Sequence, residues 1–301
     1  MSSSNRILGW AIFISLAIIW GSSFILMKRG LDAFDPYQIA AIRIGSAALF
    51  TLGIGFRRLK NLRRKDIWPL FLVGLMGNAI PYLLFPIAVT RIDTSVVGII
   101  NSLVPIFTLI IGLLWFKNPI KPSQFLGVTV GFIGAYFLIN PDTATLERTG
   151  GFALFAVAAT ICYAISVNLI QDRLRHLDSL TITVLSLLSV GIPYLIYLFL
   201  TDFTVVLTTH PKALASLGYV ILLGVLGTGI AVIFFNYLIK MTSAIFASSV
   251  TYLIPVMAIF WGWLDGEPIG LRHAVGVMGI LLGVYLVNLK KKPRQPEDDG
   301  A

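Results

Sequence analysis

Long apolar runs alternate with short polar connections over almost the whole chain. A helix needs roughly 20 mostly apolar residues to cross a bilayer. Ten runs approach or exceed this length: about 7–27, 36–56, 67–90, 94–116, 122–140, 149–171, 179–201, 213–239, 241–264 and 271–289. The pattern predicts an all-α integral membrane protein with ten transmembrane helices, followed by a polar tail at 290–301.

The composition excludes an ordinary soluble protein. The 301 residues are 57% hydrophobic and 12% charged, with a mean hydropathy of +0.87, whereas soluble domains carry about 25% charged residues. The net charge of +9 could indicate nucleic acid, but the Lys and Arg residues lie between apolar runs. We therefore interpret them as orientation signals. The single cysteine, Cys162, excludes an internal disulfide and a multi-cysteine metal site, and we predict no cofactor.

The Lys and Arg residues divide unequally between alternate connections. One side of the predicted membrane has 16 of them and the other has 6, while Arg43 falls inside a span. Cytoplasmic loops carry the excess of Lys and Arg. This asymmetry predicts a multi-pass protein of the plasma (inner) membrane with both termini in the cytoplasm.

Two prolines reveal an internal repeat. Pro105 lies in IINSLVPIFTLI and Pro255 in SVTYLIPVMAIF, 150 residues apart. Sliding the chain by 150 aligns 70–110 with 220–260 and gives seven identities, among them two glycines and the proline. The register continues to Tyr136 and Tyr285 after a one-residue deletion, and WGSSF at 20–24 roughly parallels YAISV at 163–167.

Each repeat contains five predicted spans. Because five is odd, the second copy must enter the membrane from the opposite side, which is the inverted arrangement that recurs in secondary transporters. We predict one five-helix repeat at 1–143, a second at 144–289 and a cytoplasmic tail at 290–301. In such transporters the binding site lies near the midplane, between the halves.

The two prolines are predicted hinges beside this site. Proline breaks the helical hydrogen-bond ladder, and the freed carbonyls must be satisfied by neighbours or by a water-filled cavity. Proline is also common in membrane helices for other reasons. The repeat-related pair Pro105 and Pro255 favours matched kinks that flank a cavity.

Polar and aromatic residues in the spans are the candidates for substrate contact. Asn78, Tyr82 and Phe85 recur on one face of their span, and they either line the cavity or hydrogen-bond neighbouring helices. Arg43 is a candidate for cargo contact, for snorkelling or for a structural bond to a neighbouring helix. The substrate-binding residues that we predict are Trp20, Asn78, Tyr82, Phe85, Asn101, Tyr163, Thr228, Tyr252 and Trp261.

These features resemble the drug/metabolite transporter superfamily, in particular its ten-helix branch with two EamA-type repeats. The resemblance rests on Trp20-Gly21-Ser22-Ser23-Phe24, on Arg43, on the proline-centred spans and on GEPIGLRHAVGVMGILLGVYLVN at 266–288. One departure is KNPI at 117–120, where the family often has a Gly-Glu pair. The resemblance implies export of metabolites, frequently amino acids, by alternating access between the halves.

The chemistry of the predicted cavity narrows the function. An apolar wall with a few amide and hydroxyl groups suits small amphiphilic cargo such as amino acids, including aromatic or other neutral ones. A nucleotide-sugar or drug carrier of the same superfamily is the alternative. Neither an intramembrane enzyme nor a channel is favoured, because the sequence has no catalytic set at membrane depth and no filter motif. We expect no obligatory protein partner, and transport down the substrate gradient or by exchange.

Overall fold

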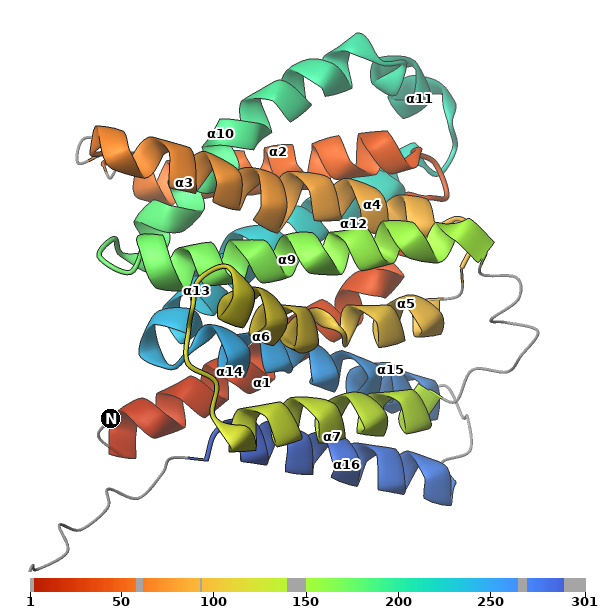
Figure 1. Cartoon of the computed structure of the whole chain (residues 1–301). Coiled ribbons are helices and arrows are strands. Elements are labelled where there is room, and N and C mark those ends of the chain that lie inside the picture. The colour runs from red at the N-terminus through yellow and green to blue at the C-terminus, as the bar shows by residue number, and fades with distance from the viewer. Residues whose placement is uncertain (1–2, 58–61, 93, 140–149, 265–269, 290–301) are drawn as a thin grey trace, which may run out of the picture.

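A computed structural model describes residues 3–57, 62–92, 94–139, 150–264 and 270–289. Every regular element among them is a helix, and most of the long helices lie within one bundle (Figure 1). The elements of the first half are α1 (Ser3–Gly30), α2 (Pro36–Gly55), α3 (Arg64–Gly74), η2 (Leu75–Ala79), α4 (Ile80–Val89), α5 (Thr94–Asn101), α6 (Val104–Leu114) and α7 (Pro122–Ile139).

The second half repeats this order with one added short α-helix and two added 3₁₀ turns, η3 and η5. Its elements are η3 (Gly150–Phe152), α9 (Ala153–Arg173), α10 (Ser179–Leu200), α11 (Phe203–Thr209), α12 (Ala213–Gly224), η4 (Val225–Ile230), α13 (Ala231–Met241), α14 (Ala244–Ser248), η5 (Ser249–Tyr252), α15 (Leu253–Leu264) and α16 (Leu271–Val287). The added helix is α11, which lies between α10 and α12 at one end of the bundle (Figure 1).

Among the described residues, seven helical segments are long and apolar enough to cross a membrane. They are Asn5–Gly30, Pro36–Gly55, Arg64–Val89, Val96–Leu114, Ala153–Arg173, Ser179–Leu200 and Ala213–Met241. Each coincides with one of the ten predicted runs. The other three runs fall on α7, on α14 to α15 and on α16, where the shorter apolar helices Ala244–Met257 and His273–Val287 lie. The structure is thus that of a multi-pass, all-helical membrane protein.

The distribution of side chains is that of a protein in lipid. Large apolar side chains such as Leu114, Trp115 and Leu200 are more than 70% exposed on the outer surface of the bundle. Polar side chains such as Asn78, Thr183 and Asn236 are fully buried inside it. Polar groups in hydrocarbon must find partners within the protein, so the interior is where a polar site can form.

Aspartates cap two helices that start at equivalent places in the halves. The side chain of Asp35 accepts hydrogen bonds from the backbone of Tyr37 and Gln38 at the start of α2. Asp178 accepts from the backbone N–H of Thr181 at the start of α10. Such caps satisfy backbone donors that the first helical turn leaves free. The two aspartates are 143 residues apart, which is also the displacement between WGSSF and YAISV.

Two helices contain a turn of π-helix at the same place in each half. The turn η2 separates α3 from α4, and η4 separates α12 from α13. Their first residues, Leu75 and Val225, are 150 positions apart. A π turn inserts an extra residue into the helix and is frequent at functional sites. These turns contain Asn78 and Thr228.

The helices that carry Pro105 and Pro255 are both interrupted just before the proline. In the first half the break separates α5 from α6, and in the second half the 3₁₀ turn η5 separates α14 from α15. A proline ring clashes with the carbonyl four residues earlier, which belongs to Asn101 or to Thr251. Each proline therefore sits in the first turn of a new helix, where its missing N–H costs nothing.

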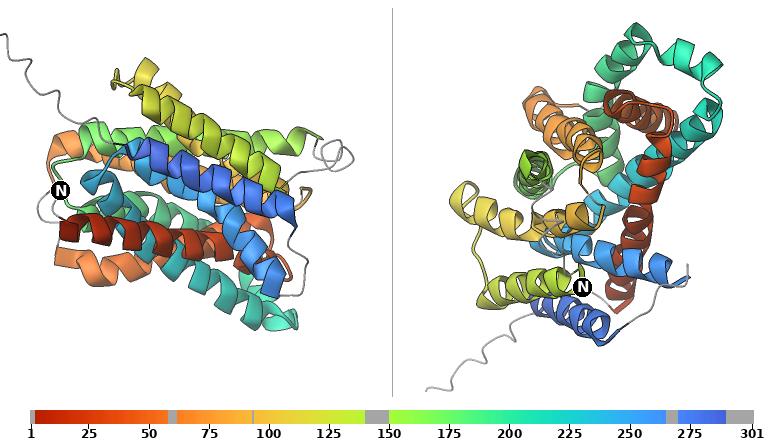
Figure 2. Two further views of the ribbon diagram at one scale, coloured as in Figure 1. Left: turned by 90° about the horizontal axis from the view of Figure 1, so that it is seen from below. Right: turned by 90° about the vertical axis from the view of Figure 1, so that its right-hand side faces the viewer.

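Glycines bring equivalent helices into backbone contact. A Cβ on Gly74 of α3 would lie 2.2 Å from the carbonyl oxygen of Ser186 on α10, and a Cβ on Gly224 of α12 would lie 2.6 Å from that of Arg43 on α2. The helices α7 and α16 also run side by side (Figure 2). There a Cβ on Gly134 would lie 2.6 Å from the Ile280 nitrogen, and one on Gly283 would lie 2.4 Å from the Gly131 nitrogen.

Candidate functional site

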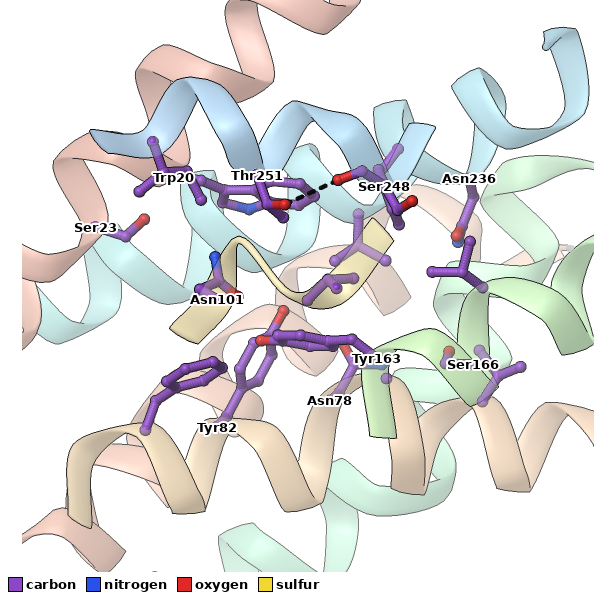
Figure 3. A pocket seen from close by; sticks show the side chains of 18 of the residues that line it. Trp20, Ser23, Asn78, Tyr82, Asn101, Tyr163, Ser166, Asn236, Ser248 and Thr251 are labelled. Atoms are coloured by element: carbon purple, nitrogen blue, oxygen red, sulfur yellow. Dashed lines mark hydrogen bonds between the residues drawn. The ribbon is translucent and has the colours of Figure 1, made fainter. Parts of the chain in front are cut away.

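A cavity of about 920 Å³, counting the part that is open to solvent, lies inside the bundle. Both halves of the chain contribute to its wall, as the labelled side chains in Figure 3 show. The lining residues are Trp20, Ser23, Met27, Arg43, Val73, Gly77, Asn78, Tyr82, Phe85, Asn101, Val104, Tyr163, Ser166, Val167, Ile170, Val232, Phe235, Asn236, Ser248, Thr251 and Ile254.

Two aromatic pairs form part of this wall. The ring centroids of Trp20 and Phe235 are 5.1 Å apart, edge to face, and those of Phe85 and Tyr163 are 5.8 Å apart and stacked. Trp20 also donates from Nε1 to the carbonyl oxygen of Gly227, at 2.9 Å. Each pair joins a helix of one half to a helix of the other. Ring packing in both pairs, and the hydrogen bond of Trp20, therefore fix the orientation of these aromatic side chains in the cavity wall.

Arg43 is the charged residue of the cavity wall, and it is only 7% exposed. Its Nε donates to the hydroxyl oxygen of Thr228 at 2.9 Å, and its guanidinium carbon lies 3.7 Å from the centroid of the Tyr82 ring. The structural bond to a neighbouring helix is therefore present, and the same side chain also reaches the cavity. Cation–π contact of this kind stabilises a partly desolvated guanidinium.

Three asparagines supply the amide groups of the wall. Asn78, Asn101 and Asn236 are each at most 5% exposed, and the Oδ1 atom of each has no hydrogen-bond partner among the described residues. The other end of Asn236 donates from Nδ2 to the hydroxyl of Thr183 at 2.9 Å. Buried amide oxygens normally have a partner. These atoms are therefore candidates for accepting hydrogen bonds from a bound molecule.

The hydroxyl groups near the two prolines mostly serve the backbone. Ser102 donates to the carbonyl of Gly98 at 3.0 Å, and Thr251 donates to that of Ser248 at 3.0 Å (Figure 3). Tyr252 donates to the carbonyl of Val128 on α7 at 2.8 Å. Of the polar residues within one turn of the prolines, Asn101 and Thr251 line the cavity.

Most of the predicted substrate-binding residues meet at this cavity. The six that line it are Trp20, Asn78, Tyr82, Phe85, Asn101 and Tyr163. Thr228 lies behind the wall as the partner of Arg43, and the buried Tyr252 points away toward α7. Trp261 belongs to α15, but its side chain is outside the described part of the chain. The two prolines are buried next to the breaks in their helices.

Sequence reasoning missed several lining residues. Among them are Ser23 and Ser166, which follow Trp20 and Tyr163 by three positions, and Asn236, which follows Phe235. A helix presents residues three positions apart on the same face. Both serines lie inside the aligned segments WGSSF and YAISV, so choosing the residues that share a helix face with Trp20 and Tyr163 would have found them.

The two ends of the bundle are closed by different contacts. At the end where α1 begins, Asp66 of α3 is only 2% exposed, and its Oδ1 lies 3.1 Å from Nε2 of His176 between α9 and α10. At the opposite end, the hydroxyl of Ser216 on α12 donates to the carbonyl of Arg29 at 2.8 Å. Asp66 is a buried carboxylate that the run boundaries had placed in a connection. Asp93 and Glu267, two acidic residues near the ends of other predicted spans, lie outside the described residues.

The helical bundle and its central cavity define the class of protein: a multi-pass membrane transporter. The chain belongs to the EamA-like transporter family of the drug/metabolite transporter superfamily, since the family's sequence profile matches residues 7–140 and again residues 151–289. The match confirms the family that the sequence motifs resembled.

Relatives of similar sequence occur in several microorganisms. An uncharacterized transporter of Archaeoglobus fulgidus is 27% identical over 94% of this chain and 99% of its own length. An uncharacterized inner membrane transporter of Escherichia coli is 23% identical over 92% of this chain and 89% of its own. An S-adenosylmethionine/S-adenosylhomocysteine transporter of Chlamydia trachomatis is 25% identical over 92% and 87%.

A solved crystal structure has the same fold. It superposes with a TM-score of 0.72, covering 95% of this chain and 98% of its own, at 15% sequence identity.

Proposed function

We propose that the chain crosses the membrane ten times as two inverted five-helix repeats with both termini in the cytoplasm. The contacts between helices support this. Gly74 of α3 meets Ser186 of α10, and the displaced partner Gly224 of α12 meets Arg43 of α2. Gly224 is displaced from Gly74 by 150 residues, and Ser186 is displaced from Arg43 by 143 residues. The displacements that relate the halves therefore convert one contact into the other, as a two-fold axis between the halves would do. The excess of Lys and Arg on one side supports the orientation.

We further propose that the protein is a secondary transporter that exports small amphiphilic metabolites, most often amino acids. The observation that carries this proposal is the cavity between the halves, with its aromatic walls, three amides and one cation. Pro105 and Pro255 act as hinges in alternating access, because each follows a break beside the cavity. Transport runs down the substrate gradient or by exchange; a strict requirement for a pH gradient would count against this.

Two alternatives within the same superfamily remain as outcomes of the test. A nucleotide-sugar carrier would need several cations for its phosphates, whereas the described lining has only Arg43. S-adenosylmethionine, which the Chlamydia trachomatis relative carries by name, shares an amino-acid end with the proposed cargo. Its adenine ring would suit the aromatic walls. This molecule therefore belongs in the panel of substrates.

The test is uptake of labelled compounds into proteoliposomes that contain the purified protein. The panel holds neutral and aromatic amino acids, S-adenosylmethionine and a nucleotide sugar. Saturable amino-acid flux that falls at least tenfold in Trp20→Ala and Tyr82→Ala would support the proposal, because each change removes an aromatic side chain that lines the cavity. Trp115→Ala, which alters an exposed side chain just after the end of α6, is the matched control. Flux of the nucleotide sugar alone would overturn the substrate assignment and leave the fold standing.

A further inference from the structure

The guanidinium of Arg43 is held at one nitrogen and on one face, and its other end has no partner within the part of the chain that the structure describes. Nε is engaged by Thr228 and the face by Tyr82. The two terminal amino groups have no hydrogen-bond or carboxylate partner among the described residues. An arginine in this state presents two parallel N–H donors, which match the two oxygens of a carboxylate.

The position of Arg43 makes an unpaired cation costly. It lies seven residues into α2, about 10 Å along the helix axis at 1.5 Å per residue, and it is 7% exposed. A buried charge in a membrane protein is unfavourable unless it is paired, and it usually marks a substrate pathway. No Asp or Glu is among the described lining residues. The counter-charge that would complete this site can therefore come from the cargo.

We propose that Arg43 binds the carboxylate of the transported molecule, so that the cavity takes a small carboxylic acid with an apolar or aromatic body. This inference rests on the proposed function and names the part of the cavity that sets the substrate class. An end-on, bidentate contact leaves the Thr228 bond intact. It is also compatible with the contact to the Tyr82 ring.

The amides next to Arg43 explain why an amino acid fits better than a simple acid. Asn78 precedes Tyr82 by four residues, so the two side chains are neighbours on one helix face, and Arg43 lies over the Tyr82 ring. Asn101 enters the same cavity from the end of α5 (Figure 3). The unpartnered Oδ1 atoms of Asn78 and Asn101 are acceptors for an ammonium group next to the carboxylate.

The experiment compares three molecules that share a phenyl ring: L-phenylalanine, phenethylamine, which lacks the carboxylate, and 3-phenylpropionate, which lacks the ammonium. Transport and competition are measured in proteoliposomes for the wild type and Arg43→Gln. We expect the wild type to prefer phenylalanine to phenethylamine about tenfold or more, because a charge-assisted pair is lost without the carboxylate. In Arg43→Gln the preference should fall to within about twofold.

Other variants separate binding from folding. Arg43→Lys keeps the positive charge but loses the two parallel N–H donors, so it should retain part of the preference for phenylalanine over phenethylamine. Thr228→Val frees Nε and should raise the concentration for half-maximal phenylalanine transport a few fold without changing phenethylamine competition, while Thr228→Ser restores the wild-type value. Arg57→Gln, which alters an exposed arginine just beyond α2, is the matched control. All variants are checked for a monodisperse, cooperatively melting protein.

Each outcome decides between the two proposals. Equal transport of phenylalanine and phenethylamine by the wild type, or an unchanged preference in a folded Arg43→Gln, would overturn the role of Arg43 while amino-acid transport stands. If the wild type moves none of the three compounds and no other amino acid of the panel, the proposed function itself fails, and this inference fails with it.

Discussion

Trp20 and Phe235 meet on one part of the cavity wall, and Tyr163 and Phe85 meet on another. The two pairs exchange under the displacements of 143 and 150 residues that relate the halves. Other lining residues pair in the same way: Ser23 with Ser166, Met27 with Ile170, Tyr82 with Val232, Asn101 with Thr251 and Val104 with Ile254. The positions that line the cavity in one half therefore correspond closely to the lining positions in the other half.

The charge does not follow this pattern. Arg43 and Ser186 occupy matching places, since the carbonyl of each faces a glycine of the paired helix, but Arg43 reaches the cavity and Ser186 does not line it. Similarly, Asn78 lines the wall, whereas its counterpart Thr228 supports Arg43. The comparison teaches that the repeat determines most of the cavity wall, and that the departures from the repeat place the charge of Arg43 and the amide of Asn78 in that wall.

The largest effect should come from the glycines between α7 and α16. Gly134→Ala and Gly283→Ala place a methyl group against backbone atoms, which cannot move aside like a flexible side chain. Overpacking typically costs about 1–3 kcal/mol, so both variants should lose at least that much unfolding free energy in detergent. If the halves are equivalent, the two losses are alike. Gly53→Ala, where nothing lies within 4 Å, should be neutral, and a similarly neutral Gly134→Ala would break the comparison.

The glycines opposite Arg43 and Ser186 should separate stability from function. Gly74→Ala and Gly224→Ala each clash with a backbone carbonyl, so both should destabilise by about 1–3 kcal/mol. Only Gly224→Ala pushes against α2 at Arg43, so it should also lower phenylalanine transport per folded molecule several fold. Thermal melting and proteoliposome flux measure the two effects. An equal loss of transport in Gly74→Ala would show that the asymmetry of charge does not matter for function.

Much of this architecture was predictable from the sequence, for identifiable reasons. Apolar runs of sufficient length predicted the multi-pass bundle, and Gly74, Gly224, Pro105 and Pro255 act on the backbone, so their register predicted matched irregularities. The π turns at Leu75 and Val225 were not predictable, because no residue type marks them. They add a residue to the helix turn and so affect which side chains face the cavity.

The site was predictable in part. Asn78, Tyr82 and Phe85 lie on one helix face, and that face lines the cavity. Tyr252 was chosen for its closeness to Pro255, but the 3₁₀ turn points it toward Val128 of α7 instead. The Arg43–Thr228 bond joins residues 185 positions apart. Such a pairing depends on how the helices pack against one another, and the periodicity of a single helix gives no information about that packing.

The two ends of the bundle should differ by a smaller amount. Asp66→Asn replaces the carboxylate that lies 3.1 Å from Nε2 of His176 and is only 2% exposed, so it should weaken this buried contact and cost about 1–3 kcal/mol. Ser216→Ala removes a neutral bond at the opposite end and should cost about 0.5–1.5 kcal/mol. Hydrogen exchange should rise at the start of α3 in the first variant and at the start of α12 in the second. Equal losses would show that the His176 contact adds little.

The aromatic pairs offer a finer test of equivalence between the halves. Double-mutant cycles with alanine at Trp20 and Phe235, and at Phe85 and Tyr163, should each give a coupling of about 0.5–1.5 kcal/mol. The exposed stack of Trp68 on Phe71 within α3, with ring centroids 5.7 Å apart, is the control and should couple less. A coupling found in only one cavity pair would mean that the two walls are not equivalent.

The smallest effect should come from the ion pair of Lys212 and Asp32, whose atoms Nζ and Oδ2 are 3.5 Å apart. Both side chains are more than a third exposed, and exposed pairs contribute about 0–1 kcal/mol. Lys212→Met should therefore change the unfolding free energy less than Ser216→Ala does. The difference between Lys212→Met and the wild type should vanish at high salt, because screening weakens exposed ion pairs. A larger, salt-independent loss would mean that α12 is held at this end by charge, not by the Ser216 bond. The contact at the start of α12 would then depend on a carboxylate, as the contact of Asp66 with His176 does, and the difference between the two ends would be smaller than their side chains suggest.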